Sequence, residues 1–349
     1  MSTNTVVTLN RTIPSGAPTL QDFKVASGSA PSKGELKTGE ILVRTLYLSC
    51  DPYMRGRLSG RTDSYVASFE AGKPIDGLGV GVVEASASSD FKEGDMVTGP
   101  TFKWATRFIT SAAGLTKIPS SSGVPPAYFL GVLGMPSFTA YVGTITLCKP
   151  KAGETILVSA ASGAVGQIVV QLAKARGLRV VGAAGSDEKV QHIKDLGADA
   201  AFNYKTVKSL DSAIKEAAPK GIDIYFDNVG GEFLDVALKN MKPNGRIAEC
   251  GMISQYNATA ESAYHIQNLA YVVMKKLTIY GFIVSDYYST PAYSEFINEV
   301  SGMLKENKIK YKMDEISGLE NGPQALLDLF EGKNFGKRIV KVSEPSHRL

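Results

Sequence analysis

The segment from Lys151 to Lys189 constrains this chain most, because it has the order strand, glycine turn, helix, strand. Residues 155–159 are apolar and rich in β-branched side chains, which is typical of a buried parallel strand. Apolar side chains then recur at helical spacing from Val165 to Ala173, and Gly177 stands where that helix would end. Residues 179–183 supply the second strand. This order predicts a βαβ unit that binds a dinucleotide.

The turn itself reads Ala-Ser-Gly-Ala-Val-Gly over residues 161–166. Gly163 would let the backbone approach a pyrophosphate, and Gly166 would let the helix pack closely on the strand. Backbone N–H groups at the start of the helix would then face the phosphates. Ala161 replaces the first glycine of the usual fingerprint, so the match is partial. The alternative is a glycine-bearing turn that binds nothing.

The end of the second strand bears on which nucleotide is bound. NAD sites usually carry Asp or Glu there, but this chain has Ala-Ala-Gly-Ser over residues 183–186. The hydroxyl of Ser186 and the ammonium of Lys189 would suit the 2′-phosphate of NADP(H), which a carboxylate would repel. Ser186 could equally cap the next helix, with Asp187 and Glu188 in its first turn. Both roles are compatible, because a helix start is also an anion site.

Composition sets further bounds. A chain of 349 residues has room for two domains, and a net charge of +4 without a dense basic block argues against nucleic acid. No apolar run is long enough to span a membrane, and the N-terminus lacks the pattern of a signal peptide. Cys50, Cys148 and Cys250 are scattered and odd in number, which favours a reducing compartment. We therefore expect a cytoplasmic protein without a disulfide framework.

The pattern of elements predicts an α/β fold. Residues 1 to about 125 have strand-like runs, at 41–48 and 79–84 for example, separated by glycine turns, which suggests a barrel-like domain. After Lys189, strands and helices alternate, which predicts a doubly wound parallel sheet. Ligands of such sheets bind at the carboxyl ends of the strands. That rule gathers a set of residues near one crevice: Ser186, Tyr204, Asn228, Gly251–Ser254, Phe282 and Ile283.

Several motifs resemble one family closely. They are Asp51–Arg57, Ala161–Gly166, Gly185–Lys189, Phe202–Tyr204, Phe226–Gly231, Cys250–Asn257 and Gly332–Lys337. In this order they are similar to the zinc-free, NADPH-dependent alkenal double-bond reductases of the medium-chain dehydrogenase/reductase superfamily, which include the leukotriene B4 dehydrogenase/prostaglandin reductases. The resemblance implies a GroES-like β-barrel-type catalytic domain, residues 1–126 completed by 300–349. It also implies a Rossmann NADP-binding domain, residues 127–299.

The resemblance also implies which residues contact the cofactor. The expected set is Gly163, Ala164, Val165, Gly166, Ser186, Lys189, Tyr204, Asn228, Cys250, Gly251, Met252, Ile253, Ser254, Gln255, Tyr256, Phe282, Ile283, Val284 and Asn334. Tyr204 would lie near the 2′-phosphate, although taken alone it could be an aromatic cover for the core. Asn228 taken alone could cap a turn. Asn334 lies in the last segment, so we expect the C-terminal tail to fold back onto the first domain.

Neither a catalytic nor a structural zinc can be assembled from the sequence. Zinc-dependent relatives use a cysteine, a Gly-His-Glu stretch and a four-cysteine lobe, whereas residues 77–79 here are Gly-Leu-Gly and the three histidines are scattered. Cys50 is therefore expected to be a small buried side chain. Without a Lewis acid, reduction of a C=C bond conjugated to a carbonyl is easier to arrange than alcohol oxidation. Hydride would add to the β-carbon, a donor would stabilise the enolate oxygen, and the α-carbon would be protonated.

Tyr256 and Tyr53 are the candidate donors, each with core or lid packing as the alternative. Plant members of the family often carry a tyrosine in the stretch that matches residues 77–80, where this chain has Leu78. The expected pocket is apolar and suits alkenals or enones. Its predicted lining is Tyr53, Leu78, Phe102, Trp104, Tyr256, Tyr287 and Tyr288.

Two other functions remain open from the sequence: a quinone reductase on the same fold, and a non-catalytic NADPH-binding protein. The family resemblance also implies a homodimer, and the strand near residues 277–282 could pair across a two-fold axis and remove an exposed sheet edge. The final residues His347, Arg348 and Leu349 resemble a peroxisomal address only loosely.

Overall fold

The computed structural model describes residues 3–120 and 123–344, so the final residues His347–Leu349 lie outside the described part. The chain divides into two compact units, Met1–Leu130 with Met313–Leu349, and Gly131–Lys312. The α/β fold class predicted from the sequence is confirmed. The boundary expected between residues 299 and 300 falls inside one helix, α8 (Pro291–Lys305). Phe296 and Val300 of that helix are buried, and the Phe296 ring lies 5.1 Å from that of Phe138, so α8 packs with the second unit.

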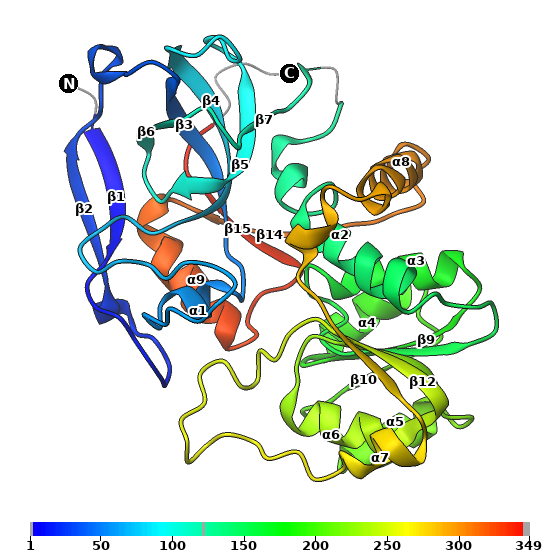
Figure 1. Ribbon diagram of the computed structural model, residues 1–349. Coiled ribbons are helices and arrows are strands. Elements are labelled where there is room, and N and C mark those ends of the chain that lie inside the picture. Colours follow the sequence, from blue (N-terminus) through cyan, green and yellow to red (C-terminus); the bar gives the residue numbers. More distant parts are fainter. Residues whose placement is uncertain (1–2, 121–122, 345–349) are drawn as a thin grey trace. The chain divides into compact units, whose positions relative to one another are not determined.

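The first unit is built on a seven-stranded sheet whose strands come from both ends of the chain. The order is β14-β15-β3-β4-β5-β7, with β6 also paired to β3 (Figure 1). The strands are β3 (Glu40–Ser49), β4 (Asp76–Ser86), β5 (Met96–Lys103), β6 (Arg107–Ser111), β7 (Thr116–Lys117), β14 (Met313–Ser317) and β15 (Lys337–Lys341). β3 is almost wholly buried because it is apolar on both faces, and Val340 of β15 pairs with its Leu48. The C-terminal segment thus returns to the sheet that the N-terminal segment begins.

Smaller elements cover this sheet. A two-stranded ribbon pairs β1 (Thr3–Leu9) with β2 (Phe23–Ser29) in antiparallel register. The helical segments are η1 (Leu20–Asp22), η2 (Lys33–Glu35), α1 (Met54–Arg57), η4 (Pro126–Leu130), η7 (Leu319–Asn321) and α9 (Gly322–Phe330). Helix α9 buries Leu326 in the same core as Val7, Phe102 and Trp104. This core makes the first unit a compact, barrel-like domain.

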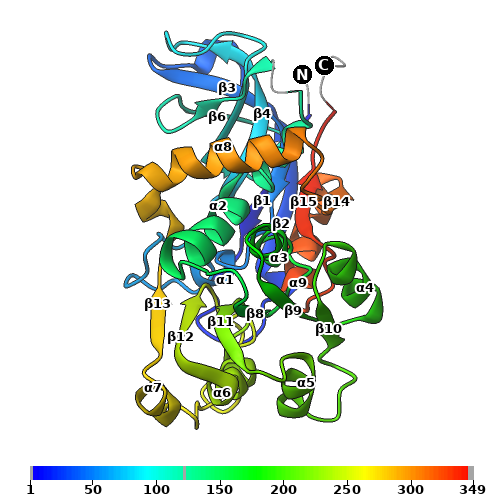
Figure 2. The ribbon, with the colours of Figure 1, turned by 90° about the vertical axis from the view of Figure 1, so that its right-hand side faces the viewer.

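The second unit contains the predicted parallel sheet. Its order is β10-β9-β8-β11-β12-β13, and every neighbouring pair is parallel, as can be followed across Figure 2. The strands are β8 (Thr155–Val158), β9 (Arg179–Ala184), β10 (Ala200–Asn203), β11 (Ile222–Asp227), β12 (Met241–Glu249) and β13 (Thr278–Gly281). β8 and β11 lie at the centre and are buried throughout their apolar stretches, which explains their continuous hydrophobic sequences.

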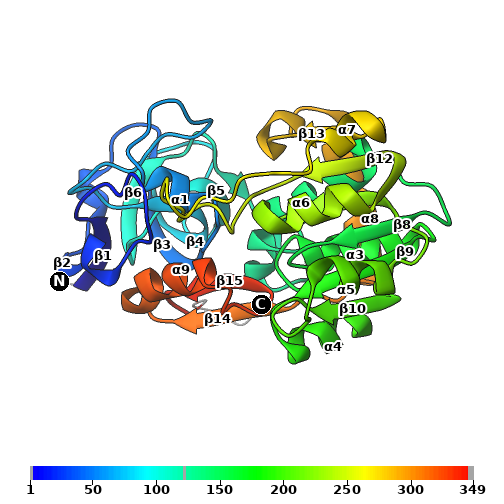
Figure 3. The same ribbon diagram turned by 90° about the horizontal axis from the view of Figure 1, so that it is seen from below.

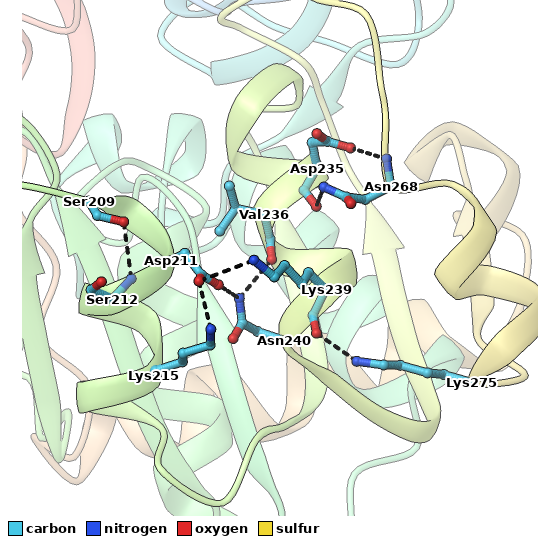
Figure 4. A network of polar contacts seen from close by, with 10 residues as sticks. All are labelled: Ser209, Asp211, Ser212, Lys215, Asp235, Val236, Lys239, Asn240, Asn268 and Lys275. Atoms are coloured by element: carbon cyan, nitrogen blue, oxygen red, sulfur yellow. Dashed lines mark hydrogen bonds and ion pairs between the residues drawn. The ribbon is translucent and has the colours of Figure 1, made fainter.

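Helices cover the second sheet on both faces (Figure 3). The helical elements of the second unit are α2 (Met135–Tyr141), continued by η5 (Val142–Leu147), α3 (Gly166–Ala175), α4 (Asp187–Asp195), α5 (Leu210–Ala217), α6 (Gly231–Asn240), α7 (Ala270–Met274), η6 (Val284–Tyr287) and α8. Of these, α8 packs on α2 rather than on the sheet. Ile214 of α5 and Phe233 of α6 share a core with Tyr225 of β11 and Ile247 of β12. The Asp211 carboxylate links α5 to α6 through the Asn240 amide at 2.8 Å (Figure 4). The described residues contain no helix long and apolar enough to cross a membrane.

Candidate cofactor and active site

The glycine turn joins β8 to α3 in a tight backbone path. A Cβ at Gly166 would lie 2.4 Å from the carbonyl oxygen of Ala160, so only glycine fits there. This confirms the packing role that the sequence predicts for Gly166. A Cβ at Gly163 would lie 3.1 Å from the same oxygen, and Ala160 itself has a positive φ of 46°. The turn is therefore packed so tightly that it excludes a side chain at Gly166, a feature that it shares with phosphate-binding glycine turns.

The end of β9 carries hydroxyl and ammonium groups instead of an acid. Ser186 caps α4, because its Oγ accepts a bond from the backbone N–H of Lys189 at 3.3 Å. The helix-capping role is thus confirmed, and the same helix start can receive an anion. Tyr204 is 43% exposed, and its hydroxyl lies 3.0 Å from the position of a Cβ on Gly185. The Lys205 Cε lies 3.1 Å from that position.

The loops that follow β11 and β12 interlock. The backbone N–H of Ile253 donates to the Asn228 carbonyl at 3.3 Å, and the Ser254 Oγ donates to the Val229 carbonyl at 2.6 Å. The Asn228 side-chain amide donates to the Ser159 carbonyl at 2.7 Å, which ties this loop to the end of β8. The structure therefore brings Asn228 together with the residues Cys250, Gly251, Met252, Ile253, Ser254, Gln255 and Tyr256 at the carboxyl edge of the sheet.

Tyr256 folds back over its own loop. Its hydroxyl accepts a bond from the Met252 backbone N–H at 3.2 Å, which holds the ring over the loop. The far end of the same loop is anchored to α6 by Asp235, which is 2% exposed. The Asp235 carboxylate accepts the Tyr264 hydroxyl at 2.9 Å. It also accepts the Asn268 backbone N–H at 2.7 Å (Figure 4). Both ends of the segment that carries Tyr256 are thus held to fixed elements.

The segment after β13 contains the other expected residues of this unit. Phe282, Ile283 and Val284 are half-buried, and the Phe282 ring lies against Gly143, where a Cβ would be 3.0 Å from it. Tyr287 is also half-buried. Tyr288 is 42% exposed, and its ring packs 5.0 Å from that of Phe138.

In the first unit, Tyr53 immediately precedes α1 and is half-buried. Burial, reinforced by the Asp51 carboxylate, raises the pKa of Tyr53, so the phenol keeps its proton. Its hydroxyl lies 3.8 Å from the position of a Cβ on Gly77, beside the half-buried Leu78. Asn334 is half-buried, and its amide donates to the Gly336 carbonyl at 2.9 Å.

Phe102 and Trp104, two of the residues expected to line the pocket, are fully buried in the core of the first unit. Phe102 fills the space over Gly79, where a Cβ would lie 2.3 Å from its ring, and Trp104 packs on Gly322 at the start of α9. Phe102 and Trp104 therefore do not line a pocket directly, and can only support the side chains that do.

The motif around Tyr53 is held by charges on either side. Asp51 pairs with Lys337 inside the core, and Arg55 donates to the carbonyls of Ile13 and Gly16 at 3.0 and 2.8 Å. Arg57 pairs with Asp76 at 2.6 Å, and its guanidinium lies 4.0 Å from the centre of the Phe69 ring. The charged residues of this motif therefore fix the short helix α1, next to which Tyr53 lies.

Comparison with known proteins gives the family. Residues 7–118 match the family described as the N-terminal domain of oxidoreductase, and residues 164–301 match that described as zinc-binding dehydrogenase. The chain is 46% identical over 329 residues to the NADP(+)-dependent 2-alkenal reductase of Nicotiana tabacum, covering 94% of each protein. It is 43% identical over 329 residues to prostaglandin reductase 1 of Bos taurus, covering 94% of this chain and 96% of the relative. The chain belongs to the alkenal and prostaglandin reductase family of the medium-chain dehydrogenases/reductases.

A solved structure agrees with this family. The crystal structure of CurA in complex with NADPH from Vibrio vulnificus superposes with a TM-score of 0.90 at 37% identity. That match covers 98% of this chain and 100% of CurA. The fold described above is thus that of a solved protein over nearly its full length.

The residues of this reductase fit a dinucleotide. Gly166 lies so close to the backbone of Ala160 and Ala161 that α3 begins directly against the turn after β8, as in a dinucleotide-binding turn. The strand end at Gly185 offers the hydroxyls of Ser186 and Tyr204, and the Asp187 carboxylate nearby is occupied by the Asn203 amide, which it accepts at 2.8 Å. Hydroxyl and ammonium groups favour a phosphorylated ribose at this position.

A metal site is not assembled within residues 3–120 and 123–344, where no group of three His, Cys, Asp or Glu side chains is placed to hold an ion. Cys50 is 1% exposed, as expected for a buried side chain, and burial raises the pKa of its thiol to about 12. A thiolate at this position is strongly disfavoured near neutral pH.

Lys205 is not among the candidate site residues that the sequence predicts. It directly follows Tyr204 at the end of β10, so its position after a strand of a parallel sheet was the available signal. Only the fold reveals that its side chain reaches Gly185, at the neighbouring strand end.

Proposed function

We propose that this protein reduces the C=C bond of α,β-unsaturated aldehydes and ketones with NADPH. The observation that carries the proposal is the 46% identity with a 2-alkenal reductase over 94% of the chain. The site described above is compatible with it, since it offers a phosphate cradle and tyrosine hydroxyls near the strand ends. The protein is an enzyme that acts on a small molecule.

NADPH supplies the hydride that adds to the β-carbon of the substrate. We propose that the turn Gly163–Gly166 holds its pyrophosphate and that Ser186, Lys189 and Tyr204 hold its 2′-phosphate. We add Lys205 to that group, because its side chain lies over Gly185. The remaining proposed cofactor contacts are Asn228, the segment Cys250–Tyr256, the segment Phe282–Val284, and Asn334.

We assign enolate stabilisation to Tyr256, with Tyr53 as the second candidate. The hydroxyl of Tyr256 accepts the Met252 N–H, which holds the ring at the loop of the proposed cofactor site, and a phenol can donate to a developing oxyanion. Tyr53 also keeps its proton near neutral pH, because burial raises its pKa. A neutral phenol is a useful donor here because its bond strengthens as negative charge grows on the substrate oxygen.

The substrate is proposed to be an apolar enal or enone. The proposed lining residues are Tyr53 and Leu78 of the first unit, and Tyr287 and Tyr288 of the second. These side chains are aliphatic or aromatic, so they favour alkenyl or aryl groups over charged ones.

We further propose a cytoplasmic homodimer. β13 is an edge strand of its sheet, and beside it α7 exposes 81% of Val273 and 71% of Met274. A second copy that pairs through β13 would cover this edge and these apolar side chains.

The deciding experiment mixes the purified protein with NADPH and a panel of 2-alkenals, cyclic enones, aryl enones and quinones. The proposal expects NADPH consumption and a saturated aldehyde or ketone as product. A quinone reductase would consume NADPH with quinones alone. A protein that binds NADPH but turns over none of these compounds would be a non-catalytic binder.

A further inference from the structure

Three polar side chains lie in a row where β8, β11 and β12 end. Asp227 and Glu249 are register partners on adjacent parallel strands, and Ser159 directly follows Val158, the partner of Phe226. Register partners of a parallel sheet point to the same face, so the two carboxyl groups are neighbours. Asp227 is fully buried, and both carboxyl oxygens of Glu249 are hidden from solvent.

The two carboxylate oxygens of Asp227 differ in the hydrogen bonds that they accept. Its Oδ1 accepts the Tyr225 hydroxyl at 2.6 Å, the Ser159 hydroxyl at 3.1 Å, and the backbone N–H groups of Val229 and Gly230 at 2.8 and 2.9 Å. Its Oδ2 accepts from no donor group in the described part of the chain, and neither do the Glu249 oxygens. The unsatisfied oxygens of these two neighbouring carboxyl groups are therefore available to each other, and burial together with the Asp227 carboxyl raises the pKa of Glu249.

A bond between two carboxyl groups needs a proton between them. Asp227 is the better anion, because four donors already stabilise its charge. Glu249 is the better acid, because burial, followed by the neighbouring Asp227 charge, raises its pKa to about 8. The pair therefore carries one negative charge and one proton at neutral pH.

Both loops of the proposed cofactor site are attached to Asp227. Its carboxylate holds the first loop through Val229 and Gly230. Its carbonyl oxygen holds the second loop, since it accepts the backbone N–H groups of Cys250 at 2.9 Å and Gly251 at 3.1 Å. The loops then pack so closely that a Cβ on Gly230 would lie 2.8 Å from the Cβ of Met252.

We propose that Asp227 and Glu249 are positioning residues, whose shared proton holds the loops of Asn228 and Gly251 in the conformation that binds NADPH. This inference rests on the proposed function of these loops. Loss of the proton would place a second buried charge next to the first, and the resulting repulsion would separate the ends of β11 and β12. NADPH would then bind more weakly.

Among the groups around the Asp227–Glu249 pair, the pair itself is the one that we expect to lose a proton near pH 8. Burial raises the pKa of Cys250 to about 12 and that of Tyr225 well above its usual value. Ser159 at the end of β8 does not titrate. The first turn of α6 contributes only Glu232, which is exposed, and β13 contributes Gly281 as the register partner of Glu249.

The test measures the NADPH dissociation constant of the full-length protein from about pH 7 to about pH 9.5, where the 2′-phosphate is fully ionised. The wild type is expected to bind about threefold to tenfold more weakly per pH unit above about pH 8. Glu249→Gln keeps a neutral hydrogen-bond donor toward Asp227, so its affinity should stay level over this range. Glu216→Gln, an exposed position on α5, is the matched control and should follow the wild type.

The outcomes separate this inference from the proposed function. Wild-type protein that does not bind NADPH at any pH overturns the function. The shared proton is overturned if the NADPH affinity of the wild type stays level to about pH 9.5. It is also overturned if the Glu249→Gln variant loses affinity at alkaline pH as the wild type does. Should Glu249→Gln fail to fold, infrared spectra of the wild type decide: a protonated carboxyl band must be present near neutral pH and lost at high pH. A spectrum without that band at neutral pH sinks the inference.

Discussion

The Nζ atom of Lys337 lies 2.7 Å from the Asp51 carboxylate and 2.9 Å from the Cys50 carbonyl oxygen, deep in the first unit. The side chains are 1% and 3% exposed. This ion pair fastens β15, near the C-terminus, to Asp51, which follows the end of β3 and precedes Tyr53 by two residues. It therefore links two of the motifs by which the chain resembles its family, Asp51–Arg57 and Gly332–Lys337.

Removing one partner of this pair should destabilise the protein strongly. Lys337→Met leaves the buried Asp51 charge without its cation, which typically costs about 3–5 kcal/mol in the free energy of unfolding. Urea denaturation followed by far-UV circular dichroism measures the change. Lys333→Met is the control, because Lys333 is 58% exposed and its removal should leave the free energy nearly unchanged. Equal stability of the two variants would contradict a structural role for the pair.

The fold of the second unit could be predicted from the sequence better than the side-chain contacts within the first unit. Short-range patterns revealed the βαβ unit, because strand, turn and helix signals all fall between Lys151 and Lys189. Asp51 and Lys337 are 286 positions apart, and no local pattern reports such a pairing. The same limit applies to Trp104, whose aromatic ring suggested a pocket wall until the fold buried it under α9. The Asp227–Glu249 contact likewise depends on strand register.

Lys189 and Lys205 should determine the preference for NADPH over NADH. Lys189→Ala should weaken NADPH binding by about 1–3 kcal/mol, the scale of a charge-assisted hydrogen bond, and leave NADH binding nearly unchanged. Lys205→Ala should act in the same direction. Fluorescence titration with both nucleotides measures the effect, and Lys194→Ala, an exposed lysine on the same helix as Lys189, is the control. Equal losses of affinity for NADPH and NADH would contradict the assignment of these lysines to the 2′-phosphate.

The edge of the second sheet should mediate dimer formation. Ile279 of β13 is 39% exposed, and a charged side chain there would oppose strand pairing between two copies. We expect Ile279→Lys to convert a dimer into a monomer in light scattering at micromolar concentration. Val25→Lys, a comparably exposed position at 42% on β2, should stay dimeric. A wild-type protein that is monomeric under these conditions would argue against the proposal.

Activity should be independent of zinc. Elemental analysis is expected to find no stoichiometric zinc, and a chelator should leave turnover unchanged. Cys50→Ala provides a second check, because the buried thiol is proposed to pack rather than to bind a metal, and the bond from Lys337 goes to its backbone carbonyl. One bound zinc per chain, with loss of activity when it is removed, would overturn this prediction.

The last prediction concerns Tyr256 and the reaction itself. Tyr256→Phe should retain the fold and lower turnover by on the order of 10²-fold, or less where a ribose hydroxyl also stabilises the oxyanion. Turnover should fall more than enone affinity, because the hydrogen bond strengthens as charge develops. Tyr264→Phe is the matched control: it removes a hydroxyl that anchors the same loop to Asp235 but leaves Tyr256 intact. A smaller loss in that variant assigns the effect to the Tyr256 hydroxyl rather than to loop order. If a saturated carbonyl forms and Tyr256→Phe turns over like the wild type, the reaction stands and another donor must be sought, with Tyr53 next. If the product is an allylic alcohol with its C=C bond intact, the proposed reaction class is wrong.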